Sequence, residues 1–358
     1  MEHATLKAWV TLARMPGIGP RRFAEITHRF ETPQAYLETQ KRPTKAVEAA
    51  VESDLRWAEQ KNCPLIPQAH DNYPKQLSQI ADPPPLLFVQ GNPQVLNQQQ
   101  VAIVGSRRAT ENGKDRAFEM AAILAANGLA ITSGLAIGID TQAHQGALAV
   151  QGQTIAVMAT GPERLYPPEN TTLAARILQT GALVTEMPVG TAVIPGLFPR
   201  RNRLISGLSL GTLVIEAGQK SGALGTAQQA LEQNRAVMAI PGAINSPLSR
   251  GCHSLIRAGA CLVETAKDVY EDLGFLDELR ANSINKTKNN QPSISLDPDL
   301  QRVIDALGYE PVSFDTLLQR LGLTPDRLSS MLLNLELLGM LIPTDGGQYE
   351  RSNQRTGG

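Results

Sequence analysis

The stretch "FPRRNRLISGLSLGTLVIEA", residues 198–217, joins a cluster of arginines to a run of apolar residues. Its second half, "GTLVIE" at 211–216, has the composition of a strand that is buried in a parallel sheet. Its first half places Arg200, Arg201 and Arg203 just before that strand. Because a buried, unpaired cation is strongly destabilising, the pattern raises the question of which anion these arginines bind.

Six other short runs have the same strand-like composition, and Ala-rich stretches with a helical pattern, such as 113–127 and 223–234, lie between most of them. The alternation of strands and helices predicts an α/β core, a parallel sheet covered by helices on both faces. The predicted core spans residues 76–280. The six runs are 101–105, 129–132, 154–159, 182–185, 236–240 and 260–263.

Two smaller units flank this core. Residues 1–75 are polar with a helical pattern, and three prolines, Pro83–Pro85, then deliver an extended chain into "LLFVQG". Residues 281–297, "ANSINKTKNNQPSISLD", have no apolar periodicity and predict a flexible linker. Residues 298–351 predict three helical stretches and a hairpin with Gly346 and Gly347 at its turn, which resembles a winged helix. The 358 residues suffice for such a division.

The small units carry weaker functional signals. In "MPGIGPRRF", residues 15–23, glycines and Pro20 precede a helix together with Arg21 and Arg22, which resembles a helix-hairpin-helix or SAM-like unit. Such a turn either binds a backbone phosphate or only packs two helices, with its arginines in solvent. The last helix of the C-terminal unit holds Asp326 and Glu336 with little positive charge. This composition favours a protein contact over reading of a DNA groove.

The overall composition and charge of the chain exclude several classes of protein. The net charge is −1, so a protein that is basic throughout is excluded but a local basic patch is not. No run approaches the ~20 apolar residues of a membrane span, and the N-terminus lacks the apolar core of a secretory signal. Cys63, Cys252 and Cys261 show no CxxC spacing. We interpret them as reduced thiols of a cytoplasmic protein, with neither disulfides nor a metal site.

Several predicted strands end in turns rich in small residues. The segments Ser106–Thr110, Ser133–Gly138 and 217–230 ("AGQKSGALGTAQQA") each follow a strand. In parallel sheets these turns meet at one edge, where backbone amides approach phosphates. Any one of these turns alone is equally compatible with an ordinary strand-to-helix turn that binds no ligand. Because the sequence has neither GxGxxG nor GK[ST], the turns together predict a phosphate-binding surface without a nicotinamide or ATP cofactor.

Candidate catalytic groups are few. Asp140 and His144 are four residues apart, on one face at the start of a predicted helix. The pair would suit acid–base catalysis, but such an Asp more often caps a helix and such a His more often packs. No third group completes a catalytic or metal site, so we predict neither.

Many motifs in order resemble one family. They include "YPKQLSQIADPPPLLFVQGN", "VAIVGSRRAT", "SGLAIGIDTQAHQGAL", "YPPEN", "FPRRNRLISGLS", "VIEAGQKSGALGTAQQALEQNRAVMAIPG" and "GCHSLIRAGA". Together these resemble the DprA, or Smf, family of DNA-processing proteins, over residues 66–265. The resemblance implies an extended Rossmann-like core that binds single-stranded DNA and forms a homodimer. It also implies a partner, the RecA recombinase, which is loaded onto incoming DNA during natural transformation.

The resemblance also implies which residues bind the DNA. They come from three turns and from the arginine-rich stretch, and aromatic residues are only 4% of the chain, so we expect contacts to the backbone with little sequence preference. The implied residues are Ser106, Arg107, Arg108, Gly134, Leu135, Ala136, Gly138, Phe198, Arg200, Asn202, Arg203, Ser221 and Gly222.

An alternative is an enzyme of the fold-related phosphoribohydrolase class, once labelled lysine decarboxylases. That class has a PGGxGTxxE motif whose glutamate serves cleavage of the nucleotide N-glycosidic bond. The corresponding stretch here is "SGALGTAQQ", with Gln229 in place of the glutamate. Because a neutral amide cannot act as a general base, we predict a binding protein and not an enzyme.

Overall fold

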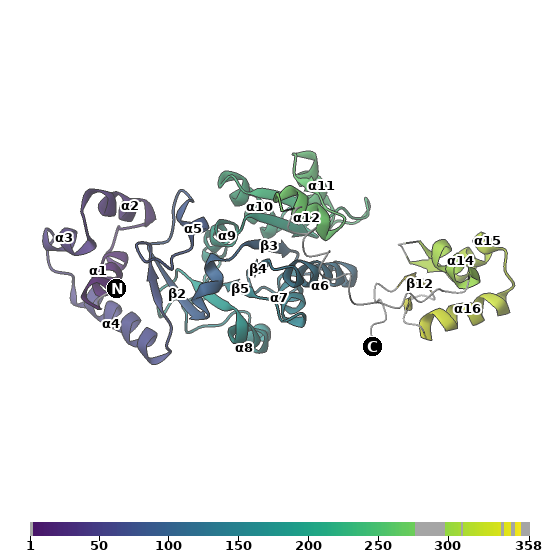
Figure 1. Ribbon diagram of the computed structural model, residues 1–358, viewed down its shortest axis with the longest axis horizontal. Coiled ribbons are helices and arrows are strands. Elements are labelled where there is room, and N and C mark those ends of the chain that lie inside the picture. The colour runs from purple at the N-terminus through teal and green to yellow at the C-terminus, as the bar shows by residue number, and fades with distance from the viewer. Residues whose placement is uncertain (1–2, 276–297, 309–310, 338–339, 345–347, 352–358) are drawn as a thin grey trace. The chain divides into compact units, whose positions relative to one another are not determined.

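The computed structural model describes residues 3–275, 298–308, 311–337, 340–344 and 348–351 (Figure 1). The chain divides into two compact units, Met1–Ile284 and Asn285–Gly358. The predicted linker at 281–297 lies outside the described residues. Among the helices in the described part of the chain, none has the length and hydrophobicity that crossing a membrane requires.

The first unit is built on one sheet of nine strands, in the order β1-β2-β6-β5-β4-β3-β7-β8-β9. The seven strands from β3 to β9 are parallel and confirm all seven predicted strands. The other two are antiparallel and form one edge, so the sheet is mostly, not wholly, parallel. The strands are β1 (Leu65–Pro67), β2 (Leu86–Gly91), β3 (Gln100–Gly105), β4 (Ala130–Ser133), β5 (Thr154–Val157), β6 (Ala182–Thr185), β7 (Gly211–Ile215), β8 (Ala236–Ala239) and β9 (Cys261–Leu262).

Helices cover both faces of this sheet because side chains alternate along each strand. In β3, Val101 and Ile103 face one apolar cluster, and Ala102 and Val104 face the other. The first face is covered by α6 (Glu111–Ala126), α7 (Ile139–Ala149), α8 (Thr171–Thr180) and α12 (Ala266–Asp272). The second face is covered by α5 (Lys75–Ser78), α9 (Leu197–Leu208), α10 (Gly222–Glu232) and α11 (Arg250–Arg257).

The strand order changes direction between β3 and β7. From β3 the chain proceeds through β4 and β5 to β6 on one side, and it then returns to place β7 on the other side of β3. The turns that follow β3 and β7 therefore lead away from each other at the carboxyl edge of the sheet. Such a switch point leaves a crevice in which ligands of open α/β sheets bind.

Four helices precede the sheet: α1 (His3–Arg14), α2 (Pro20–Arg29), α3 (Pro33–Glu38) and α4 (Lys45–Gln60). The helical part ends before residue 65, because β1 pairs with β2 and belongs to the sheet. Apolar side chains of α1 and α4 pack on that edge in one cluster with Leu86 and Phe88. Both Asp54 and Arg14 bond the backbone of Val189, which ties these helices to the segment after β6.

The second unit confirms the predicted winged helix. It contains α14 (Pro298–Leu307), β10 (Val312–Ser313), α15 (Phe314–Leu321), α16 (Pro325–Leu337), β11 (Leu341–Thr344) and β12 (Gln348–Arg351). The strands β11 and β12 pair as an antiparallel hairpin, and β10 adds to β12. The predicted glycines at the hairpin turn lie outside the described residues.

Candidate nucleic-acid interface

A groove of about 760 Å³ lies at the carboxyl ends of β3 and β7, at the switch point of the sheet. Its walls come from the turns after these two strands and from the first turns of α9 and α10. Most of the predicted DNA-binding residues meet here, although they come from segments that span more than 100 residues of the sequence. The predicted residues that line the groove are Ser106, Arg107, Arg108, Ala136, Phe198, Asn202, Ser221 and Gly222.

The turn after β3 is held in place by Glu216, which directly follows β7. The Glu216 carbonyl accepts a hydrogen bond from the Ser106 amide at 2.7 Å. Its carboxylate accepts two more from Thr110, at 2.8 Å from the amide and 2.5 Å from the hydroxyl. Thr110 also caps α6. The backbone on both sides of Arg107 and Arg108 is therefore fixed, while both side chains are exposed.

Arg107 lines the groove next to Phe198. Its guanidinium carbon lies 5.5 Å from the centre of the Phe198 ring, a cation–π contact. The Phe198 ring meets the Tyr166 ring edge-on at 5.6 Å. Within the described residues, Arg107, Arg108 and Lys220 form no salt bridge with a carboxylate. These three cations are thus available to an anionic ligand.

Gly138 allows the turns after β3 and β4 to touch. Its φ is +85°, and a Cβ atom at this position would lie 2.3 Å from the carbonyl oxygen of Ser106. The amide of Ile139 donates to that same oxygen at 3.2 Å. Gly138 was predicted as a DNA contact, and its place in the structure is a packing position between the two turns.

The turn after β4 directs much of its polar backbone inward. The amides of Gly134 and Ala136 donate to one oxygen of Asp140, at 3.0 and 3.3 Å. The carbonyl of Leu135 accepts a hydrogen bond from Asn170, and the Leu135 side chain is buried. Any contact that a ligand makes with this turn must therefore use other groups than these two amides.

Asp140 and His144 do not form an accessible acid–base pair. The Asp140 carboxylate is buried, and this burial raises its pKa, against the opposing effects of Arg201 and the amide hydrogen bonds. His144 is fully buried, and Nδ1 contacts the Thr154 hydroxyl at 2.7 Å. Burial lowers the pKa of His144 to about 3, and Arg201 acts in the same direction. His144 is therefore a neutral side chain of the core.

Arg201 lines the groove from a buried position. It donates hydrogen bonds to the carbonyl oxygens of Gly134, at 2.7 Å, and of Val157. A Cβ atom at Gly134 would lie 2.7 Å from this guanidinium, so the glycine provides the space for it. Burial lowers the pKa of Arg201 to about 10, although nearby Asp140 opposes the shift. Arg201 thus ties together the carboxyl ends of β4 and β5.

Arg203 and Arg200 lie on another side of α9, next to Glu186. The Arg203 guanidinium pairs with Glu186 at 2.5 Å and with Asp82 at 3.2 Å, and it also donates to the Asp82 carbonyl. Because Arg203 is buried and each of its three guanidinium nitrogens bonds a protein oxygen, this geometry disfavours the predicted direct contact of Arg203 with DNA. The half-exposed Arg200 pairs with Glu186 at 3.3 Å.

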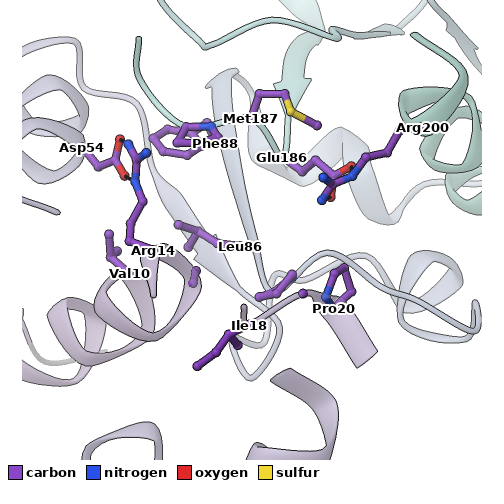
Figure 2. Close-up of a pocket in the computed structure, with 14 residues that line it drawn as sticks. Val10, Arg14, Ile18, Pro20, Asp54, Leu86, Phe88, Glu186, Met187 and Arg200 are labelled. Carbon is purple, nitrogen blue, oxygen red and sulfur yellow. Dashed lines mark hydrogen bonds and ion pairs between the residues drawn. The ribbon is translucent and has the colours of Figure 1, made fainter. Parts of the chain in front are cut away.

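Figure 2 shows that Arg200 belongs to a second cavity, of about 310 Å³. Arg200 and Glu186 lie on one side of this cavity, and the ion pair of Arg14 with Asp54 lies on the other, with apolar residues such as Leu86 between them. Arg200 does not line the groove at the switch point.

The wall formed by α10 adds polar groups. Ser221 caps this helix by accepting from the Ala223 amide at 3.3 Å, and Gly222 is its exposed first residue. Asn202 donates to the Gly222 carbonyl at 3.4 Å. Sequence reasoning did not single out Lys220 or Tyr166, which also line the groove. Lys220 stands inside the motif "AGQKSGALG", where its place between two glycines was the available signal, and Tyr166 begins the motif "YPPEN".

Within the residues that the structure describes, no group of three or more His, Cys, Asp or Glu side chains could hold a metal ion. Gln229 lies on α10, donates to Glu232 at 2.9 Å, and does not line the groove. The three cysteines are free thiols, and Cys63 and Cys252 are buried.

A mostly parallel sheet with a cationic groove at its switch point, followed by a winged helix, defines a Rossmann-like α/β protein with an accessory winged-helix unit. Family comparison agrees: DNA recombination-mediator protein A matches residues 64–274, and the DprA winged helix domain matches 287–347. The chain belongs to the DprA (Smf) family of DNA-processing proteins.

Individual relatives cover much of the chain. Protein Smf of Escherichia coli is 41% identical over 303 residues, which are 83% of this chain and 80% of that protein. The structure of DNA processing protein A from Streptococcus pneumoniae covers 74% of this chain and 95% of its own, with 34% identity and a TM-score of 0.63. The Helicobacter pylori structure, described for its single-stranded DNA binding mode, covers 62% and 96%, with 29% identity and a TM-score of 0.54.

The burial of neutral His144 predicts a pH dependence of stability. In the unfolded chain a histidine binds a proton below about pH 6.5, whereas in the folded protein His144 binds a proton only below about pH 3. Unfolding therefore takes up a proton between these values, and the free energy of unfolding falls as the pH falls. His144→Gln should make this decline shallower by about 1.36 kcal/mol per pH unit, measured by urea denaturation.

The exposed His28 provides the control, because His28→Gln should leave the slope as in the wild type. Equal slopes for the wild type and His144→Gln would show that His144 does not carry this effect.

Proposed function

We propose that the groove at the switch point binds single-stranded DNA through its backbone phosphates. The observation that carries this proposal is that the buried arginines are bonded to protein groups, whereas the exposed cations in the groove are not paired with carboxylates in the described part of the chain. The arginines inside the protein, Arg201 and Arg203, are bonded to carbonyl oxygens and carboxylates, whereas Arg107, Arg108 and Lys220 in the groove have no carboxylate partner among the described residues. Unpaired cations concentrated in a groove attract a polyanion.

The form of the groove suits a strand better than a single nucleotide. Its cations come from two separate turns, after β3 and after β7, and not from one compact cradle. A single strand presents phosphates at regular intervals and can use several such contacts in a row. The exposed Gly222 at the start of α10 lies beside Lys220 and allows a strand to approach the helix closely.

We expect little sequence preference. Phe198 is the aromatic residue nearest to the groove cations, and its ring already contacts Arg107 and Tyr166. Stacking on aromatic rings is therefore limited, and the contacts available to DNA are mostly cations, hydroxyls and amides. The relative from Helicobacter pylori, whose structure was described for binding single-stranded DNA, supports this assignment.

We further propose that the protein binds DNA without catalysing a reaction on it. The phosphoribohydrolase alternative needs an acid near the ligand, but Gln229 is bonded to Glu232 on α10, outside the groove. Asp140 is bonded to backbone amides, and His144 is buried and neutral. No release of base from nucleoside monophosphates is expected.

Salt dependence of DNA binding tests the proposed surface. Replacing Arg107 or Lys220 with alanine should weaken binding of single-stranded oligonucleotides similarly for all sequences. Each change should reduce the magnitude of the slope of log affinity against log salt by about 0.7, the single-strand value per phosphate contact. Fluorescence anisotropy at several salt concentrations measures this slope.

Arg176→Ala is the matched control, because Arg176 is an exposed arginine on α8 that does not line the groove. It should keep the wild-type slope. Slopes that are unchanged in both groove variants, or reduced equally in all three, would contradict the assignment.

The family resemblance leads to a finer proposal, that the protein acts as a homodimer and loads RecA recombinase onto incoming strands during natural transformation. A dimer would bind one strand in two grooves. Once the first groove has bound the strand, binding in the second groove is intramolecular. Exposed apolar residues, such as Leu231 on α10 and Leu262 on the edge strand β9, suit such a contact. They lie in the stretches 223–240 and 255–265.

We expect the protein to accelerate RecA filament formation on strands coated by a competing single-strand-binding protein. The Arg107→Ala variant should lose most of this effect, and light scattering should show a dimer at micromolar concentration. Arg176→Ala is again the control. A monomeric mass with and without DNA, or no acceleration by a wild-type protein that binds DNA, would count against this finer proposal.

A further inference from the structure

The turn between β4 and α7 has the geometry of a phosphate site, but its own side chain fills it. In nucleotide-binding α/β proteins, amides of such a turn converge on a phosphate at the start of a helix. Here the amides of Gly134 and Ala136 converge on one carboxylate oxygen of Asp140, at 3.0 and 3.3 Å. Asp140 is the second residue of α7, so the anion belongs to the helix itself.

Burial raises the pKa of Asp140, and the nearby Arg201 and the two amide hydrogen bonds oppose this effect by stabilising the carboxylate. The nearest cation is Arg201, which is buried with Asp140 and donates its hydrogen bonds to the carbonyls of Gly134 and Val157. Arg201 therefore attracts an anion here without using its own hydrogen bonds for it. His144, one turn further along α7, is neutral and does not contribute a second positive charge.

We propose that the Asp140 carboxylate is a built-in substitute for phosphate, and that it excludes free nucleotides from this turn. A phosphate that entered would meet a like charge and two amides that are already bonded. A strand does not need this cradle, because Arg107 and Lys220 lie on other turns of the groove. Asp140 thus makes the groove selective for polynucleotides over inorganic phosphate and nucleoside monophosphates. The exclusion itself does not depend on whether DNA binds.

Removal of the carboxylate tests the proposal. In the full-length Asp140→Ala variant, the two amides and Arg201 are left without an anion. Inorganic phosphate or AMP at 10 mM should then raise the melting temperature of this variant by about 3 °C, relative to sodium chloride of equal ionic strength. The wild type should show no such shift, because its cradle is full.

Asp140→Asn is the matched control. Its amide oxygen still accepts from Gly134 and Ala136, and its side chain still occupies the space, so phosphate should stabilise it far less than Asp140→Ala. If Asp140→Ala folds poorly, recovery of its near-ultraviolet circular dichroism with added phosphate or acetate provides the same test. Stabilisation of the wild type equal to that of Asp140→Ala, or no effect of any anion on Asp140→Ala, would overturn the proposal. Failure of DNA binding in the wild type would contradict the proposed function and leave this result unaffected.

Discussion

The hydrogen bonds of the buried Arg201 guanidinium to the carbonyls of Gly134 and Val157 hold the groove in shape. They join the carboxyl ends of β4 and β5 to the first turn of α9, which carries Phe198. Phe198 in turn contacts the exposed Arg107. The buried Arg201 thus positions the exposed Arg107 through Phe198. Because a buried, unpaired guanidinium is strongly destabilising, the carbonyl groups that Arg201 bonds must keep their positions.

Helix α9 explains why arginines so close in sequence have different roles. Phe198 and Asn202 line the groove at the switch point, Arg201 lines it from a buried position, and Arg200 and Arg203 pair with Glu186 elsewhere. The 3.6-residue period of a helix directs these neighbours to different surroundings. The arginines of α9 are therefore bonded to protein groups, carbonyl oxygens for Arg201 and Glu186 for Arg200 and Arg203. In our proposal, DNA phosphates bind the cations on the other turns of the groove.

Composition and periodicity were sufficient to predict the parallel strands and the winged helix, because both depend on local patterns of apolar residues. The antiparallel edge was harder to predict, since β1 is only three residues long and follows a polar helical region. The turns of the groove were found from their small residues. The ion pair of Arg203 was not foreseeable, because Asp82 is 121 residues away and only the order of the strands brings it close.

The central claim, that buried and groove-facing arginines serve different ends, is tested most directly by Arg203→Ala measured for both stability and DNA binding. Loss of this buried partner leaves the buried Glu186 paired only with the half-exposed Arg200, so the free energy of unfolding should fall by about 3 kcal/mol, while the salt slope of single-stranded DNA binding stays that of the wild type. An unfolding free energy within about 0.5 kcal/mol of wild type, together with a reduced salt slope, would contradict the account.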